Sequence, residues 1–145
     1  MEKIISINNL SISFNKNSNV VRNIDLEIIK GKTTAIVGES GSGKTLSALS
    51  ILKLLPNNAR ITNGEILFKD KDILKFTENE IQKIRGGKIA TIFQEPMTSL
   101  NPLHTINKQI EEIIITHNNF SIDKVKNRVA DLLKEVGLKD IVEKT

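Results

Sequence analysis

A glycine-rich loop in the first third of the sequence has the residue types and the spacing that bind phosphate. It follows the pattern G-x-x-x-x-G-K-[ST] at eight consecutive residues: Gly38, Glu39, Ser40, Gly41, Ser42, Gly43, Lys44 and Thr45. Glycines let the backbone come close to a ligand, so that successive N–H groups can surround α- and β-phosphates. The Lys44 ammonium would reach the β- and γ-phosphates, and the Thr45 hydroxyl would ligate Mg²⁺. The loop predicts a site for a magnesium-bound nucleotide.

The segments that flank the loop are those needed to position it. Residues Thr33–Val37 form a short β-branched, apolar run, which predicts a buried strand. Residues Lys44–Leu55 are rich in helix-forming residues and contain no Gly or Pro, so they predict a helix that Pro56 brings to an end. A strand, a glycine-rich turn and the start of a helix form an anion site. The alternative, a Gly/Ser-rich linker, does not explain these flanks.

Other patterns predict the elements that surround this unit. Apolar residues alternate along Ile5–Phe14 but change phase at Asn8–Asn9, which indicates a strand with a bulge. Thr77 and Glu80 have the spacing of a capping box that opens a helix over Glu78–Arg85. The remaining predicted elements are a strand or strand pair at Val20–Ile29, a strand at Ile61–Phe68 interrupted at residues 63–64, a strand at Lys88–Phe93, and helices at 105–116 and 121–136 followed by Gly137. Strands alternating with helices predict an α/β protein.

Composition narrows the class of protein. The chain has 145 residues, about the length of one domain, with 21 Lys and Arg against 17 Asp and Glu. These basic residues are scattered and have almost no aromatic residues between them, which argues against nucleic-acid binding. There is no cysteine for a disulfide or a thiolate metal site, no apolar run of membrane-spanning length and no signal-peptide pattern at the N-terminus.

Two segments together give the chain a family resemblance. They are GESGSGKT at residues 38–45 and IFQEPMTSLNP at residues 92–102. With them the chain resembles the N-terminal part of the ATP-binding subunit of an ABC transporter, in the group that imports peptides or nickel. The resemblance implies a truncated P-loop NTPase fold of the ABC ATPase type, an α/β fold. Residues 1–102 would be its β-rich and phosphate-loop part, and residues 103–145 the start of its helical subdomain.

The resemblance also implies roles for single residues. Lys44 and Gln94 would be catalytic. Thr45 would ligate Mg²⁺, and Gln94 would contact Mg²⁺ or the attacking water; alternatively, Gln94 is a polar residue that ends a strand. Phe14 would stack on the adenine of ATP, or would belong to the core with Leu10 and Ile12, whose face it shares. Residues 94–102 would contact the transmembrane permease subunits, unless they are a proline-bounded surface loop.

The implied function is ATP-driven import of peptides, with nickel as the second choice of cargo. The subunit would lie on the cytoplasmic face of the cell membrane and would pair with a second ATPase subunit. Residues 1–145 contain no LSGGQ-like signature, no apolar run ending in Asp-Glu and no downstream switch histidine. We therefore expect this chain alone to bind Mg-ATP weakly, without turnover, and to be marginally stable because strands 33–37 and 88–93 would lack their neighbours. The alternatives are a non-functional truncated product, or another P-loop kinase or GTPase, which would leave residues 92–102 unexplained.

Overall fold

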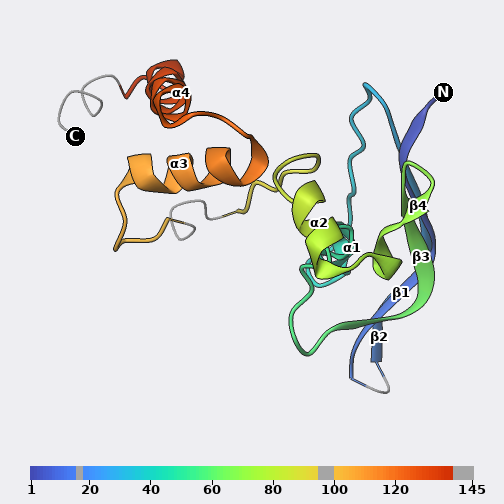
Figure 1. Ribbon diagram of the computed structural model, residues 1–145. Helices are drawn as coiled ribbons and strands as arrows, with labels where there is room; N and C mark the ends of the chain where they lie inside the picture. The colour runs from blue at the N-terminus through green and yellow to red at the C-terminus, as the bar shows by residue number, and fades with distance from the viewer. Residues whose placement is uncertain (16–17, 95–99, 139–145) are drawn as a thin grey trace. The chain divides into compact units, whose positions relative to one another are not determined.

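A computed structural model describes residues 1–15, 18–94 and 100–138, which divide into two compact units, Met1–Arg85 and Gly86–Thr145 (Figure 1). Each unit has its own buried apolar residues. The predicted division of the chain lay after residue 102, whereas the boundary between the units lies after Arg85. The assignment of residues 103–145 to a helical subdomain stays a prediction.

An antiparallel sheet is the main element of the first unit. Its strands are β1 (Lys3–Asn15), β2 (Ser18–Ile29), β3 (Arg60–Phe68) and the short β4 (Lys71–Asp72), in the order β2-β1-β3-β4. The three long strands confirm the predicted strands at these places. The sequence pattern did not predict β4, since two residues are too few to show an alternation.

The bulge predicted in β1 is present. The register with β2 shifts between Ile7 and Leu10, and Asn9 has a positive φ of 50° at this point. Because one extra residue reverses the side-chain alternation, the apolar residues on both sides of the shift remain buried. Strand β3 passes very close by. A Cβ atom added to Gly64 would lie 2.6 Å from the Asn8 carbonyl oxygen, so only glycine fits there.

The helices of the first unit also bury side chains. They are α1 (Lys44–Ser50), the 3₁₀-helix η1 (Ile73–Lys75) and α2 (Glu78–Ile84). Six apolar side chains of this unit are at most 1% exposed: Ile7, Leu10, Ile12, Ile66, Ile73 and Ile81. Burial of these side chains is the main source of stability for the unit.

The capping box at the start of α2 is confirmed. The Glu80 carboxylate accepts hydrogen bonds from the backbone N–H and the hydroxyl of Thr77, both at 2.8 Å, and the Glu80 N–H donates to Thr77 Oγ1 at 3.4 Å. The hydrogen bond from the Thr77 backbone, followed by the one from its side chain, lowers the pKa of Glu80 below the ordinary glutamate value.

Two of the predicted strands are not strands in the structure. Neither Thr33–Val37 nor Lys88–Phe93 forms a strand, and their side chains are largely exposed, with Val37 at 88% and Ile92 at 93%. A strand requires a hydrogen-bonded neighbour, and neither segment pairs with a sheet within the part of the chain that the structure describes. Apolar, β-branched composition alone therefore does not produce a strand here.

The end predicted for the helix after the loop is also wrong. Helix α1 ends at Ser50 and not near Leu55. Lys53 adopts a left-handed conformation with a φ of 53°, and the Leu54 N–H donates to the Leu49 carbonyl oxygen at 3.0 Å. This is the hydrogen bond of a Schellman motif, which ends the helix before Pro56 is reached.

The second unit contains the two predicted helices, α3 (Ile106–His117) and α4 (Ile122–Glu135). They pack through a small apolar cluster of Ile114, Val125, Val129 and Leu133. Gly137 follows α4 with a φ of 82°, and the Leu138 N–H donates to the Leu133 carbonyl oxygen at 2.9 Å, as the predicted C-terminal glycine requires. Among the described residues, no helix is both long and apolar enough to cross a membrane.

Candidate functional site

The phosphate loop begins as an exposed segment and ends against the sheet. Residues 38–42 are exposed, whereas Gly43 is buried at the start of α1. A Cβ atom added to Gly43 would lie 2.5 Å from Val21 Cγ2 in β2, and the φ of Gly43 is 91°. Both the close approach and the backbone angle require glycine, so β2 fixes the point at which the loop becomes a helix.

The Lys44 side chain folds back over the loop. Its Nζ donates to the carbonyl oxygens of Gly38 at 2.8 Å and of Glu39 at 2.6 Å, and it lies 3.4 Å from Ser42 Oγ. An ammonium group has three N–H donors. Two of them make short bonds to the loop backbone and the third makes a long one, so this third donor can turn to a phosphate oxygen while the other two hold the loop closed.

Two serine side chains of the short helix that follows the loop bond to the helix's own backbone. The Ser47 N–H and hydroxyl both donate to the Gly43 carbonyl oxygen, at 2.9 and 3.0 Å. The Ser50 hydroxyl donates to the Ser47 carbonyl oxygen at 2.7 Å. Both serines are buried. The sequence pattern did not single them out, because serine within a helix does not reveal which carbonyl group its hydroxyl will bond.

The other predicted site residues lie on separate elements of the chain. Thr45 is exposed in the first turn of α1, and Phe14 is half-buried near the end of β1. Gln94 is exposed and belongs to the second unit. The structure therefore brings together the loop residues 38–45 alone, and the roles of Phe14 and Gln94 stay predictions.

The predicted contact region for permease subunits is described only in part. Residues 95–99 lie outside the described residues. The segment after them is attached to α3, because Gln109 Nε2 donates to the carbonyl oxygens of Asn101 and His104, at 3.0 and 2.9 Å. The Asn101 N–H donates in return to Gln109 Oε1 at 2.9 Å.

The groups that the loop offers suit a magnesium-bound nucleotide. It offers an ammonium group, exposed backbone and no Cβ at its closest approach to β2. When bound, Mg²⁺ would offset the charge of the phosphates, and the Thr45 hydroxyl is the oxygen ligand that the loop would provide. Among the described residues, no group of three His, Cys, Asp or Glu side chains is placed to hold a metal ion by itself.

The glycine-rich loop, its lysine and the α/β elements around it define the class of protein as a P-loop nucleotide-binding cassette. Residues 21–145 match the ABC transporter family, and the chain belongs to this family.

Relatives with known descriptions lie within the same family. The chain is 44% identical to the oligopeptide transport ATP-binding protein AppD of Bacillus subtilis over 94% of its own length and 43% of the relative's. It is 42% identical to the dipeptide transport ATP-binding protein DppD of the same organism, over 97% of its own length and 43% of the relative's. The chain thus spans less than half the length of these relatives.

Solved structures show the same fold. A dimeric ATP-binding cassette in a post-hydrolysis state, bound to ADP and Pi, has a TM-score of 0.73 and 26% identity, over 90% of this chain and 56% of that one. Another dimeric bacterial ABC transporter cassette has a TM-score of 0.73 and 27% identity over the same shares. The expected fold class is confirmed.

Proposed function

We propose that this chain is the nucleotide-binding part of the ATP-binding subunit of an ABC importer for peptides. The observation that carries the proposal is the closed loop at residues 38–45, with the Lys44 ammonium 2.8 Å from the Gly38 carbonyl oxygen. The descriptions of the oligopeptide and dipeptide relatives support the choice of cargo.

In this proposal the loop backbone and Lys44 hold the phosphates of ATP, and Thr45 contributes a ligand to Mg²⁺. Phe14 stacks on the adenine, and Gln94 contacts Mg²⁺ or orients the attacking water. An uncharged amide suits the latter role, since it can accept and donate hydrogen bonds at once. The subunit lies on the cytoplasmic face of the membrane, pairs with a second ATPase subunit and contacts the permease through residues 94–102.

A titration with a fluorescent ATP analogue tests nucleotide binding. We expect the 145-residue chain to bind the magnesium complex weakly and the Lys44→Ala variant to bind at least tenfold more weakly, because the variant lacks the charge that reaches the phosphates. Lys32→Ala, which changes an exposed lysine upstream of the loop, is the matched control and should bind as the unchanged chain does. Equal binding by the unchanged chain and Lys44→Ala would overturn the proposal.

Phosphate release tests the expectation of no turnover. Residues 1–145 contain neither a signature sequence nor an Asp-Glu pair at the end of an apolar run, and these groups position the water and the metal in phosphoryl transfer. We expect the 145-residue chain to release phosphate from ATP no faster than the Lys44→Ala variant does. A clear excess from the unchanged chain would contradict this part.

Uptake in cells tests the cargo. A natural full-length subunit that carries these residues should support ATP-dependent uptake of labelled di- or oligopeptides, and Lys44→Ala in that subunit should abolish it. Uptake of nickel without uptake of peptides would show that the cargo is nickel and not peptides. Uptake of neither would remove the importer proposal and would leave nucleotide binding to the titration above.

A further inference from the structure

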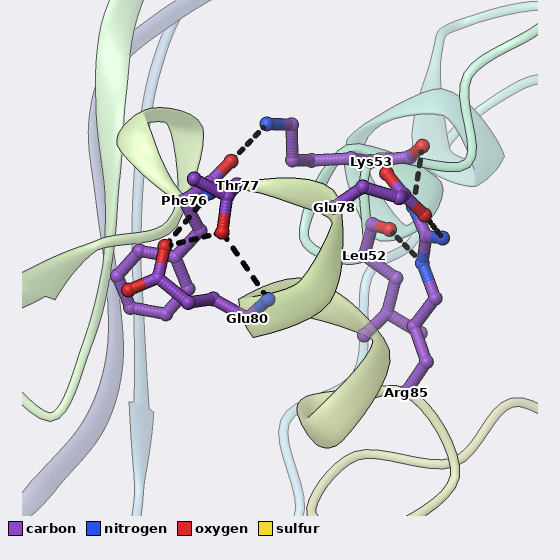
Figure 2. Close-up of polar contacts among 7 residues, drawn as sticks. All are labelled: Leu52, Lys53, Phe76, Thr77, Glu78, Glu80 and Arg85. Carbon is purple, nitrogen blue, oxygen red and sulfur yellow. Dashed lines mark hydrogen bonds and ion pairs between the residues drawn. The ribbon is translucent and has the colours of Figure 1, made fainter.

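The turn that follows α1 is hydrogen-bonded to residues far away in the sequence. Arg85 Nε donates to the Leu52 carbonyl oxygen at 2.8 Å, and Arg85 Nη2 donates to the Lys53 carbonyl oxygen at 3.2 Å (Figure 2). Arg85 Nη1 pairs with Glu78 Oε1 at 2.6 Å. All three guanidinium nitrogens are therefore engaged, and the side chain is only 25% exposed.

A second cation reaches in the opposite direction. Lys53 lies in the turn after α1, and its Nζ donates to the carbonyl oxygen of Phe76 at 2.9 Å (Figure 2). The same Nζ donates to the carbonyl oxygen of Leu74 at 3.2 Å. The two cations thus form a reciprocal clamp between residues 52–53 and the segment 74–85. We call these four bonds to backbone carbonyl oxygens the Arg85–Lys53 clamp.

Helix α1 depends on such contacts because its own sequence gives it little support. It has seven residues, no acidic residue in its first turn, no basic residue in its last turn and no side-chain hydrogen bond at its N-cap. A helix this short is marginal in isolation. The carbonyl groups in the turn after α1 have no N–H partner within the helix, and Arg85 bonds to two of them. The guanidinium also places positive charge at the C-terminal end of α1, where the helix dipole is negative.

We propose that Arg85 is a positioning residue for the phosphate loop, acting through the turn after α1 and assisted by Lys53. Lys44 and Thr45 are the first residues of α1, so a tilt of the helix moves both groups relative to the loop carbonyls. The clamp holds the far end of α1 and so fixes its direction. This inference rests on the proposed function, since it concerns how the chain holds the phosphates of a nucleotide.

Paired titrations with fluorescent analogues of ATP and AMP test the role of Arg85. AMP lacks the β- and γ-phosphates that Lys44 would reach. Arg85→Lys keeps the charge but replaces the planar guanidinium, whose three nitrogens reach three separate acceptors, with a single nitrogen. We expect it to weaken ATP binding about tenfold and to leave AMP binding unchanged. Arg128→Lys is the matched control, since Arg128 pairs with Glu135 seven residues away, as Arg85 does with Glu78; it should change neither affinity.

A second variant separates positioning from folding. Lys53→Asn removes the ammonium group, but asparagine tolerates the left-handed backbone at this position. It should also lower ATP binding selectively, and the double variant should lose less than the product of the two single losses, because both act on one clamp. Circular dichroism should show the same helix content in every variant.

The outcomes distinguish the two proposals. If the unchanged chain does not bind ATP in preference to AMP, the proposed function fails. If it does, and both clamp variants keep the same ratio of ATP to AMP affinity, the role of Arg85 is overturned while the proposed function stands. A proportional loss of both ligands would show a general loss of folded protein and would also overturn the positioning role.

Discussion

Val21 in β2 and Gly43 at the start of α1 are in such close contact that a Cβ atom on Gly43 would lie 2.5 Å from Val21 Cγ2. This contact joins the antiparallel sheet to the phosphate loop, two parts that are 22 residues apart in the sequence. Gly43 therefore serves the packing of the loop against β2.

We expect Gly43→Ala to abolish detectable ATP binding in the fluorescence titration. The new methyl group would contact Val21, and the φ of 91° would cost a further ~1–2 kcal/mol for any residue with a side chain. The double variant Gly43→Ala with Val21→Ala should recover part of the ATP binding, because the smaller side chain at residue 21 leaves room for the new methyl group. Recovery should be incomplete, because the backbone strain at residue 43 remains. Unchanged binding by Gly43→Ala alone would contradict the contact.

Thr77→Ala should destabilise the chain by about 1 kcal/mol, because it removes the side-chain oxygen that caps α2. Ser121→Ala is the matched comparison, since Ser121 stands at the N-cap of α4 without a side-chain capping hydrogen bond. It should cost only a few tenths of a kcal/mol. Urea unfolding measures both, and equal losses would mean that the capping box adds nothing.

The stability contributed by Glu80 should depend on pH. Its pKa is lowered in the folded state by the hydrogen bonds from Thr77. The stabilisation is therefore fully present above the ordinary glutamate value of about 4.3 and is lost as pH falls through the folded-state pKa. The difference in melting temperature between the unchanged chain and Glu80→Gln should shrink as pH falls through this range. In a Thr77→Ala background the same comparison should show no such trend.

Ile81→Ala should be far more damaging than a similar change at the surface. Ile81 is completely buried, so its truncation should cost about 2–5 kcal/mol. Val37 is 88% exposed, and Val37→Ala in the same unit should change stability by less than about 0.5 kcal/mol. Urea unfolding of both variants tests the assignment of the core, which fails if the two losses are equal.

The exposed apolar segments should limit the solubility of the 145-residue chain. Val37 and Ile92 are the most exposed large apolar side chains of the two runs at 33–37 and 88–93. Exposed apolar, β-branched runs without a sheet partner promote aggregation. We expect Val37→Lys with Ile92→Lys to raise the soluble fraction after expression. Asn57→Lys with Asn119→Lys, which adds the same charge at two exposed polar positions, should not do so.

Several features of the fold followed from local patterns. The change of phase at Asn8–Asn9 predicted the bulge in β1, since alternation along a strand reports directly which face is buried. The Thr77–Glu80 spacing predicted the start of α2, because a capping box is made within four residues. The phosphate loop was likewise recognisable because its chemistry lies in eight consecutive residues.

Other features depended on partners far away in the chain. The runs at 33–37 and 88–93 have strand-like composition, yet neither is a strand in the described structure, because a ladder needs a neighbour. The end of α1 at Ser50 was not predictable from Pro56 either. It depends on the left-handed Lys53, whose carbonyl oxygen is held by Arg85 from 32 residues away.

The sequence by itself therefore determined the family, the phosphate loop and the local starts and ends of helices, since each of these is written in a few neighbouring residues. The tertiary structure decided how the loop is held: Val21 requires a glycine at residue 43, and Arg85 and Lys53 hold the end of α1. These contacts join residues that are 21 to 33 positions apart. Only the folded chain brings such groups within hydrogen-bonding or van der Waals distance, so no local pattern could reveal them.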